Sequence, residues 1–94
     1  MNAIWEVWIR TTHGNRAQNM CRILIDGRAF YWGKGHNGEG AAITEPRTGR
    51  RICVDVSLEM AKREVRRLME IYNIDEVIEA AILKHGELPK PRRL

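Results

Sequence analysis

Cysteine is scarce in this chain, and no part of it is apolar over a long stretch. Only Cys21 and Cys53 are present among the 94 residues, a pattern that suits reduced thiols better than the disulfide framework of a small secreted domain. No segment approaches the roughly 18 apolar residues of a membrane span. The residues from Met1 to Arg10 also lack the apolar run of a signal peptide. We therefore predict a cytoplasmic protein that has no membrane as a partner.

Histidine and cysteine residues that could bind a metal or act in catalysis are also few and far apart in the sequence. The histidines, His13, His36 and His85, have no spacing typical of a zinc site, and neither cysteine lies near a histidine at ligand spacing. Residues 33–38 match the glycine pattern of a dinucleotide-binding turn, but that turn must open a helix, and no helix is predicted after it. We expect no metal site, no cofactor and no enzyme activity. Residues 33–40 remain a glycine-rich loop that offers Lys34 to a ligand.

Acidic residues are outnumbered by basic ones. The chain has 16 Lys and Arg against 12 Asp and Glu, which gives a formal net charge of +4. The basic excess falls into three clusters: Arg47, Arg50 and Arg51; Lys62, Arg63, Arg66 and Arg67; and Lys90, Arg92 and Arg93. Such a balance favours an acidic partner, either nucleic acid or an acidic protein surface, without choosing between them.

Alternation of apolar and polar residues governs the first half of the chain. Residues 3–10 predict a strand with one apolar face, and the opposite face carries Trp8 and Arg10. Residues 12–19 have no periodicity and are interpreted as a long polar loop, which is either solvated or used for binding.

The strongest local signal is the Asp26-Gly27 pair between two apolar segments. A two-residue Asp-Gly loop favours a type I′ hairpin, which also fixes the register of the two strands. The predicted pairs are Ile25 with Arg28, Leu24 with Ala29, Ile23 with Phe30, Arg22 with Tyr31, and Cys21 with Trp32. The face with Phe30 is interpreted as core. Arg22 and Tyr31 then lie on the other face, either as a cation–π pair or as a stacking platform for bases.

Two further strands are expected before the alternation ends. Residues 41–44 form a short one, and residues 45–49 have the proline and glycine placement of a turn. Residues 51–56 return as a strand, with Ile52, Val54 and Val56 facing inward and Arg51, Cys53 and Asp55 facing outward.

Helical spacing of apolar residues replaces the alternation at Ser57. We predict that Ser57 caps a first helix, whose apolar stripe packs on the sheet while Lys62 and Arg66 lie on its charged face. Asp75 is predicted to cap a second helix, which ends before Gly86.

The predicted fold class is therefore α+β. An antiparallel meander sheet of four to five strands precedes two C-terminal helices, which are expected to pack side by side on one face of it. Residues 1–87 form this single domain, and residues 88–94 form a basic tail whose prolines keep it extended.

These features together favour a small, non-enzymatic binding module. The leading partner is nucleic acid, bound through a basic, aromatic-bearing surface. The predicted contact residues are Trp8, Arg10, Arg22, Tyr31, Lys34, Arg51, Lys62 and Arg66. The alternative is a module without nucleic acid that pairs with an acidic protein, or with a second copy as a homodimer. Its interface would be an outer sheet face carrying Ile4, Trp8, Leu24 and Tyr31.

Overall fold

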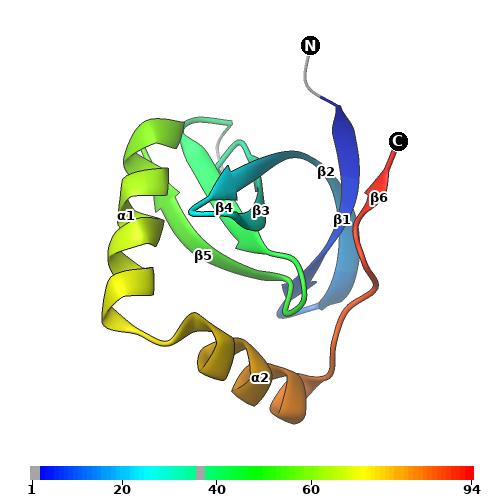
Figure 1. Ribbon diagram of the computed structural model, residues 1–94. Coiled ribbons are helices and arrows are strands. Elements are labelled where there is room, and N and C mark those ends of the chain that lie inside the picture. Colours follow the sequence, from blue (N-terminus) through cyan, green and yellow to red (C-terminus); the bar gives the residue numbers. More distant parts are fainter. Residues whose placement is uncertain (1–2, 36–37) are drawn as a thin grey trace.

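A computed structural model describes residues 3–35 and 38–94, which form one antiparallel sheet and two helices. The strands lie in the order β5-β4-β3-β2-β1-β6, and Figure 1 shows how they curl beside the helices. The elements are β1 (Ile4–Thr11), β2 (Gly14–Ile25), β3 (Arg28–Gly33), β4 (Ala41–Glu45), β5 (Arg50–Asp55), α1 (Leu58–Ile71), α2 (Ile74–His85) and β6 (Arg92–Arg93). The predicted α+β meander is confirmed, with six strands rather than four to five because β6 joins the sheet after the helices.

The hairpin of β2 and β3 has the predicted register. All five predicted pairs occur, from Ile25 with Arg28 to Cys21 with Trp32. Asp26 and Gly27 turn the chain with positive φ angles of 50° and 81°, as a type I′ turn requires. The predicted core face is also confirmed, since Ile25 and Phe30 are fully buried.

The segment predicted as a long polar loop belongs largely to β2. Pairing between β1 and β2 continues as far as Thr11 with Gly14, so only two residues remain in the turn. The Thr11 hydroxyl donates to the Gly14 carbonyl and accepts from the His13 N–H, which holds this turn in place. The loop prediction for residues 12–19 is wrong because most of this arm is exposed on both faces and therefore shows no alternation.

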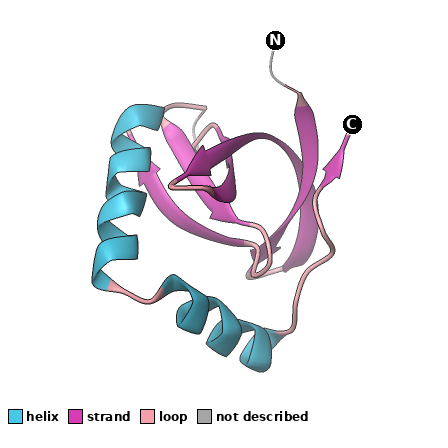
Figure 2. Ribbon diagram, viewed as in Figure 1, coloured by secondary structure: helices cyan, strands magenta, loops and turns pink. Residues whose placement is uncertain are grey.

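The sheet curls so far that β1 meets the turn between β4 and β5. The N–H of Arg10 donates to the carbonyl of Gly49 at 2.9 Å across this closure. The curl, visible in Figure 2, separates two cores. The core under α1 contains Ile25, Phe30, Ala41, Ile43, Ala61 and Val65, and the core on the concave face contains Val7, Ile9, Met20 and Tyr31.

The position of Tyr31 follows from this curl. Tyr31 is only 5% exposed and meets Trp5 edge to face, with 5.7 Å between the ring centroids. The guanidinium of Arg22 lies 5.4 Å from the centroid of the Trp5 ring, so the cation–π partner of Arg22 is Trp5. The prediction of Tyr31 on an open outer face is wrong because β1 folds over that face.

One extra residue in β5 changes which of its side chains face α1. The pairing shifts between Ile43 and Thr44 of β4, and Ile52 is left as a β-bulge. Ile52 and Cys53 both pack against the core under α1. Val54 and Val56, which were predicted to face inward, are both exposed. That prediction holds only for Ile52, because strict alternation ends at the bulge.

The helix starts are set by side-chain caps. Ser57 caps α1 as predicted, and its side chain accepts from the Met60 N–H at 3.2 Å. The cap of α2 is Asn73, which accepts from the Glu76 N–H, so the prediction of Asp75 is wrong by two positions. An asparagine one residue before a helix competes well with an aspartate inside its first turn.

The two helices differ in how they meet the sheet. α1 buries Ala61 and Val65 fully, whereas Ile78 is the one residue that α2 buries within the described chain. Figure 1 shows the helices meeting at a corner. The predicted side-by-side packing is wrong because α2 turns toward the β4–β5 end of the sheet.

The segment from residue 88 to residue 94 lies against the domain. Leu88 is buried, and its N–H donates to the Arg47 carbonyl. β6 pairs with β1, and the Leu94 N–H donates to the Ile4 carbonyl at 2.9 Å. The segment is extended, and its strand β6 forms one edge of the sheet.

Candidate functional site

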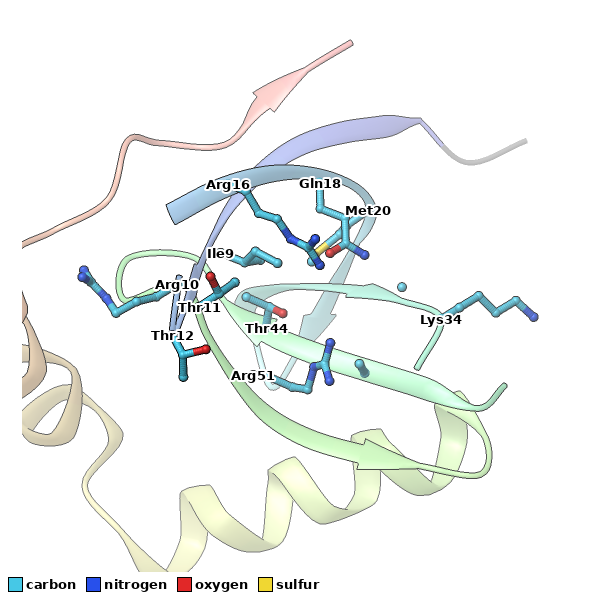
Figure 3. Close-up of a pocket in the computed structure, with 13 residues that line it drawn as sticks. Ile9, Arg10, Thr11, Thr12, Arg16, Gln18, Met20, Lys34, Thr44 and Arg51 are labelled. Carbon is cyan, nitrogen blue, oxygen red and sulfur yellow. The ribbon is translucent and has the colours of Figure 1, made fainter. Parts of the chain in front are cut away.

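A cavity of about 350 Å³ opens on the concave face, at the end where β1 meets the β4–β5 turn. All five of the longer strands contribute to its walls (Figure 3). It is lined by Ile9, Arg10, Thr11, Thr12, Arg16, Gln18, Met20, Gly33, Lys34, Ala42, Thr44, Gly49 and Arg51. Neither helix supplies a lining residue among these, so the curl of the sheet alone builds the site.

Two arginines from opposite walls converge on this cavity. Arg16 extends from β2 and Arg51 from β5, and Figure 3 shows their guanidinium groups directed into the same space. Lys34 lies at the rim and points outward. The side chain of Arg10 also leaves the cavity and donates to the carbonyls of Thr48 and Gly86. The cavity is thus framed by four basic side chains, two of which point inward.

The bulge in β5 gives Arg51 its direction. With strict alternation, Arg51 would lie on the same face as Cys53, which packs under α1. The extra residue at Ile52 reverses this phase, so that Arg51 pairs with Thr44 on the concave side. Bulges commonly redirect a side chain beside a functional site.

The cavity carries charge of one sign. No Asp or Glu is among the described residues that line it. Within residues 3–35 and 38–94, the side chains of Arg16, Lys34 and Arg51 take part in none of the ion pairs. Arg47, by contrast, bridges Glu79 and Glu87 at 2.9 Å each. Guanidinium groups that converge without a counter-charge repel one another, and an anion between them would turn this repulsion into attraction.

Apolar groups lie beneath the two arginines. Ile9, Met20 and Ala42 are buried and line the cavity, together with the polar side chains of Gln18 and Thr44. A concave site with apolar walls and a few converging polar groups is typical of a ligand pocket. This arrangement can hold a molecule that joins an anionic group to a flat or apolar part.

The predicted contact residues are divided among three surfaces. Lys34 and Arg51 line the cavity, and Arg22 and Tyr31 lie on the same concave face outside it. Burial raises the pKa of Tyr31, and the positive charge of Arg22 opposes this shift without cancelling it. Of the eight predicted contact residues, Arg10, Lys34 and Arg51 therefore line one recess, and only Arg51 directs its side chain into it.

The side chains of the other four predicted contact residues point elsewhere. Trp8 and Arg10 point to the convex face, because they alternate with the buried residues of β1. On α1, Lys62 pairs with Glu59 at 3.8 Å, and Arg66 pairs with Asp26 at 3.5 Å. Trp8, Lys62 and Arg66 do not share a surface with the cavity, whereas Arg10 lines it but directs its side chain away toward the carbonyls of Thr48 and Gly86.

The patch expected for the protein-interaction alternative is also divided. Ile4 and Trp8 lie on the convex side of β1, whereas Leu24 and Tyr31 lie on the concave side of the β2–β3 hairpin. Ile4 and Leu24 are exposed, but Tyr31 is buried. The four residues therefore do not form one outer face.

Sequence reasoning missed Arg16, which lies in the arm mistaken for a loop. The available signal was that residues 12–19 are polar and either solvated or used for binding, but without strand pairing no side chain among them could be given a direction. Gln18 and Thr44 were missed for a related reason, since only the curl brings them to one cavity.

Backbone hydrogen bonds fold the described part of the glycine-rich loop. Gly35 donates to the Glu39 carbonyl, and Gly38 donates to the Gly35 carbonyl, so the described part of residues 33–40 is a compact turn. His36, one of the three histidines whose spacing is not typical of a zinc site, lies outside the described residues. In the part of the chain that the structure describes, no three His, Cys, Asp or Glu side chains are grouped to hold a metal ion. No helix in the same part is long and apolar enough to span a membrane.

Comparison with known proteins gives no independent assignment of this site. No protein family, no curated protein and no solved structure matches the chain.

Proposed function

We propose that this protein is a non-enzymatic binding module of the cytoplasm that holds a single strand of nucleic acid in the concave cavity. The observation that carries this proposal is the convergence of Arg16 and Arg51 on a recess whose described lining has no acidic residue. In this proposal, both guanidinium groups bind backbone phosphates. Arginine suits this role because its planar fork can donate two parallel hydrogen bonds to one phosphate.

The shape of the site favours one strand over a duplex. A base or sugar can enter between the arginines and rest against Ile9 and Met20, whereas a duplex presents its bases inside its own stack and could only lie across the mouth. Lys34 at the rim and Arg22 further along the concave face would then follow the neighbouring phosphates. The other described basic residues on α1 are left as solvated or ion-paired groups.

Titration of fluorescently labelled oligonucleotides, followed by anisotropy, tests the proposal. We expect Arg16→Ala and Arg51→Ala each to weaken binding of a single-stranded oligonucleotide by about tenfold or more, since a hydrogen bond to a charged group contributes about 1.5–3 kcal/mol. Arg63→Ala is the matched control. It removes the same charge from an exposed position of α1 outside the cavity, and it should leave the affinity within about twofold.

Salt dependence supplies the second measurement. Four basic side chains at phosphates predict a slope of about −2.8 for log K against log salt, or about a fiftyfold loss of affinity between 50 and 200 mM salt. Absence of binding at low salt would overturn the proposal. Equal losses in the Arg51→Ala and Arg63→Ala proteins would show that only net charge matters, and binding of inorganic phosphate as tightly as the oligonucleotide would show a small-anion site instead.

A further inference from the structure

One exposed stripe of α2 combines apolar residues with one charge of each sign, and its Val77 edge borders a groove between α2 and β5. Glu76, Val77, Ala80, Leu83 and Lys84 are all exposed, and Leu83 is 89% exposed. At 100° per residue, these five positions lie within about 60° on either side of Ala80. An apolar centre is therefore flanked by one acidic and one basic residue, at opposite ends of the stripe.

This stripe is complementary to itself. If a second α2 packs antiparallel to the first about a twofold axis at Ala80, Glu76 lies opposite Lys84 of the partner, and Val77 lies opposite Leu83 of the partner. The small side chain of Ala80 meets its own copy on the axis and allows the helices to approach closely. In a parallel pair, by contrast, each charge would meet a like charge.

The charges of the stripe are free to make these contacts. Neither Glu76 nor Lys84 takes part in an ion pair within the described residues. The other acidic residues of α2 form ion pairs within the chain: Asp75 pairs with Arg28 at 2.6 Å, and Glu79 pairs with Arg47 at 2.9 Å. Those two contacts lie on the side of α2 away from the stripe, between α2 and the sheet.

We infer that this face of α2 is an interface for a second copy of the chain, in an antiparallel, twofold-symmetric helix pair. The inference is independent of the proposed function, because α2 contributes nothing to the lining of the cavity. One short helix from each copy buries less than the roughly 800 Å² per partner of stable complexes. The dimer is therefore weak and depends on protein concentration.

Sedimentation equilibrium of the full chain, from about 10 μM to about 1 mM, measures this association. We expect Leu83→Asp to raise the dissociation constant at least tenfold, since it places a charge in the apolar centre twice per dimer. The matched control is Val56→Asp, which introduces the same charge at an apolar residue that is 76% exposed and outside α2. It should leave the association unchanged. A parent protein that stays monomeric over this range, or equal effects of both variants, would overturn the inference.

Mixing two single variants tests the pairing of the charges. Glu76→Lys and Lys84→Glu each place like charges opposite one another in a homodimer, so each variant alone should associate more weakly than the parent. In the mixed dimer of one with the other, both pairs become attractive. We expect the mixture to recover the parent mass at concentrations where each variant alone is monomeric, and no recovery would refute the twofold arrangement. Nucleic-acid binding can fail or succeed without affecting either result.

Discussion

Gly49 occupies the point where the two ends of the curled sheet meet. Its φ angle is +68°, and a Cβ added there would lie 2.9 Å from the Arg10 nitrogen and 3.1 Å from the Trp8 carbonyl oxygen, besides colliding with the Leu88 side chain. The Leu88 side chain could move, but the backbone of β1 could not without opening the closure. Glycine is therefore required at position 49 for two reasons: the φ angle is positive, and the backbone of β1 lies too close to allow a Cβ atom.

Substitution of Gly49 tests this closure. We expect Gly49→Ala to lower the free energy of unfolding by about 2–4 kcal/mol, from backbone strain together with the steric conflict. Gly27→Ala is the control, since Gly27 also has a positive φ but nothing lies within 4 Å of an added Cβ. It should cost only about 1 kcal/mol. Urea denaturation measures both values, and equal losses would show that the contact with β1 contributes nothing.

Single residues show how far the sequence could predict the site. Arg51 and Lys34 were predicted as contacts and do line the cavity, but the reasons differ from those given by composition. Arg51 points inward because of the bulge at Ile52, and a bulge leaves no mark in a pattern of alternating residues. Arg16 was missed because its neighbours are polar on both faces of the strand.

At the scale of elements, turns and helix caps could be predicted from neighbouring residues, whereas the packing of the helices on the sheet could not. The Asp26-Gly27 turn and the Ser57 cap depend on contacts within four residues, and both are confirmed. The position of α2 depends on partners far along the chain, such as Arg47 with Glu87 and Arg10 with the Gly86 carbonyl. No periodicity within α2 specifies those partners.

The two helices should differ in local stability. α1 is held by two fully buried residues, whereas α2 buries only Ile78 within the described chain and adds the half-buried Ile74 and exposed ion pairs, which contribute little each. We expect the amides of α2 to exchange with deuterium faster than those of α1 or β3 at a protein concentration low enough to keep the chain monomeric. Exchange resolved by mass spectrometry checks this. Equal protection of both helices would mean that α2 unfolds only with the whole domain.

At the scale of the whole molecule, the curl decides which surfaces are free. The sequence predicted one sheet with an inner and an outer face, whereas the structure has a core on each face and a cavity where the concave core ends. Curvature is a sum of small twists over many residues, assisted here by one bulge, and no short pattern encodes it. This is why strand pairing could be predicted from the chain and the location of the site could not.

The concave core also predicts that the free energy of unfolding falls at alkaline pH. Burial raises the pKa of Tyr31 above its ordinary value of about 10. The folded state then retains a proton that the unfolded state loses, so stability is fully present below about pH 10 and declines as pH rises toward the folded-state pKa. We expect Tyr31→Phe, compared with the parent by denaturation between about pH 9 and 11.5, to remove part of this decline. Parallel curves for the two proteins would show that Tyr31 does not titrate differently on folding.

The pairing of β6 with β1 has a consequence for how this domain can be joined to other chains. Because the Leu94 N–H bonds to the Ile4 carbonyl, the first strand of the described chain begins beside the point where the last strand ends. The domain could therefore be inserted into a loop of a host protein without stretching it. It should also tolerate circular permutation through a short linker, with new ends opened at the exposed β1–β2 turn.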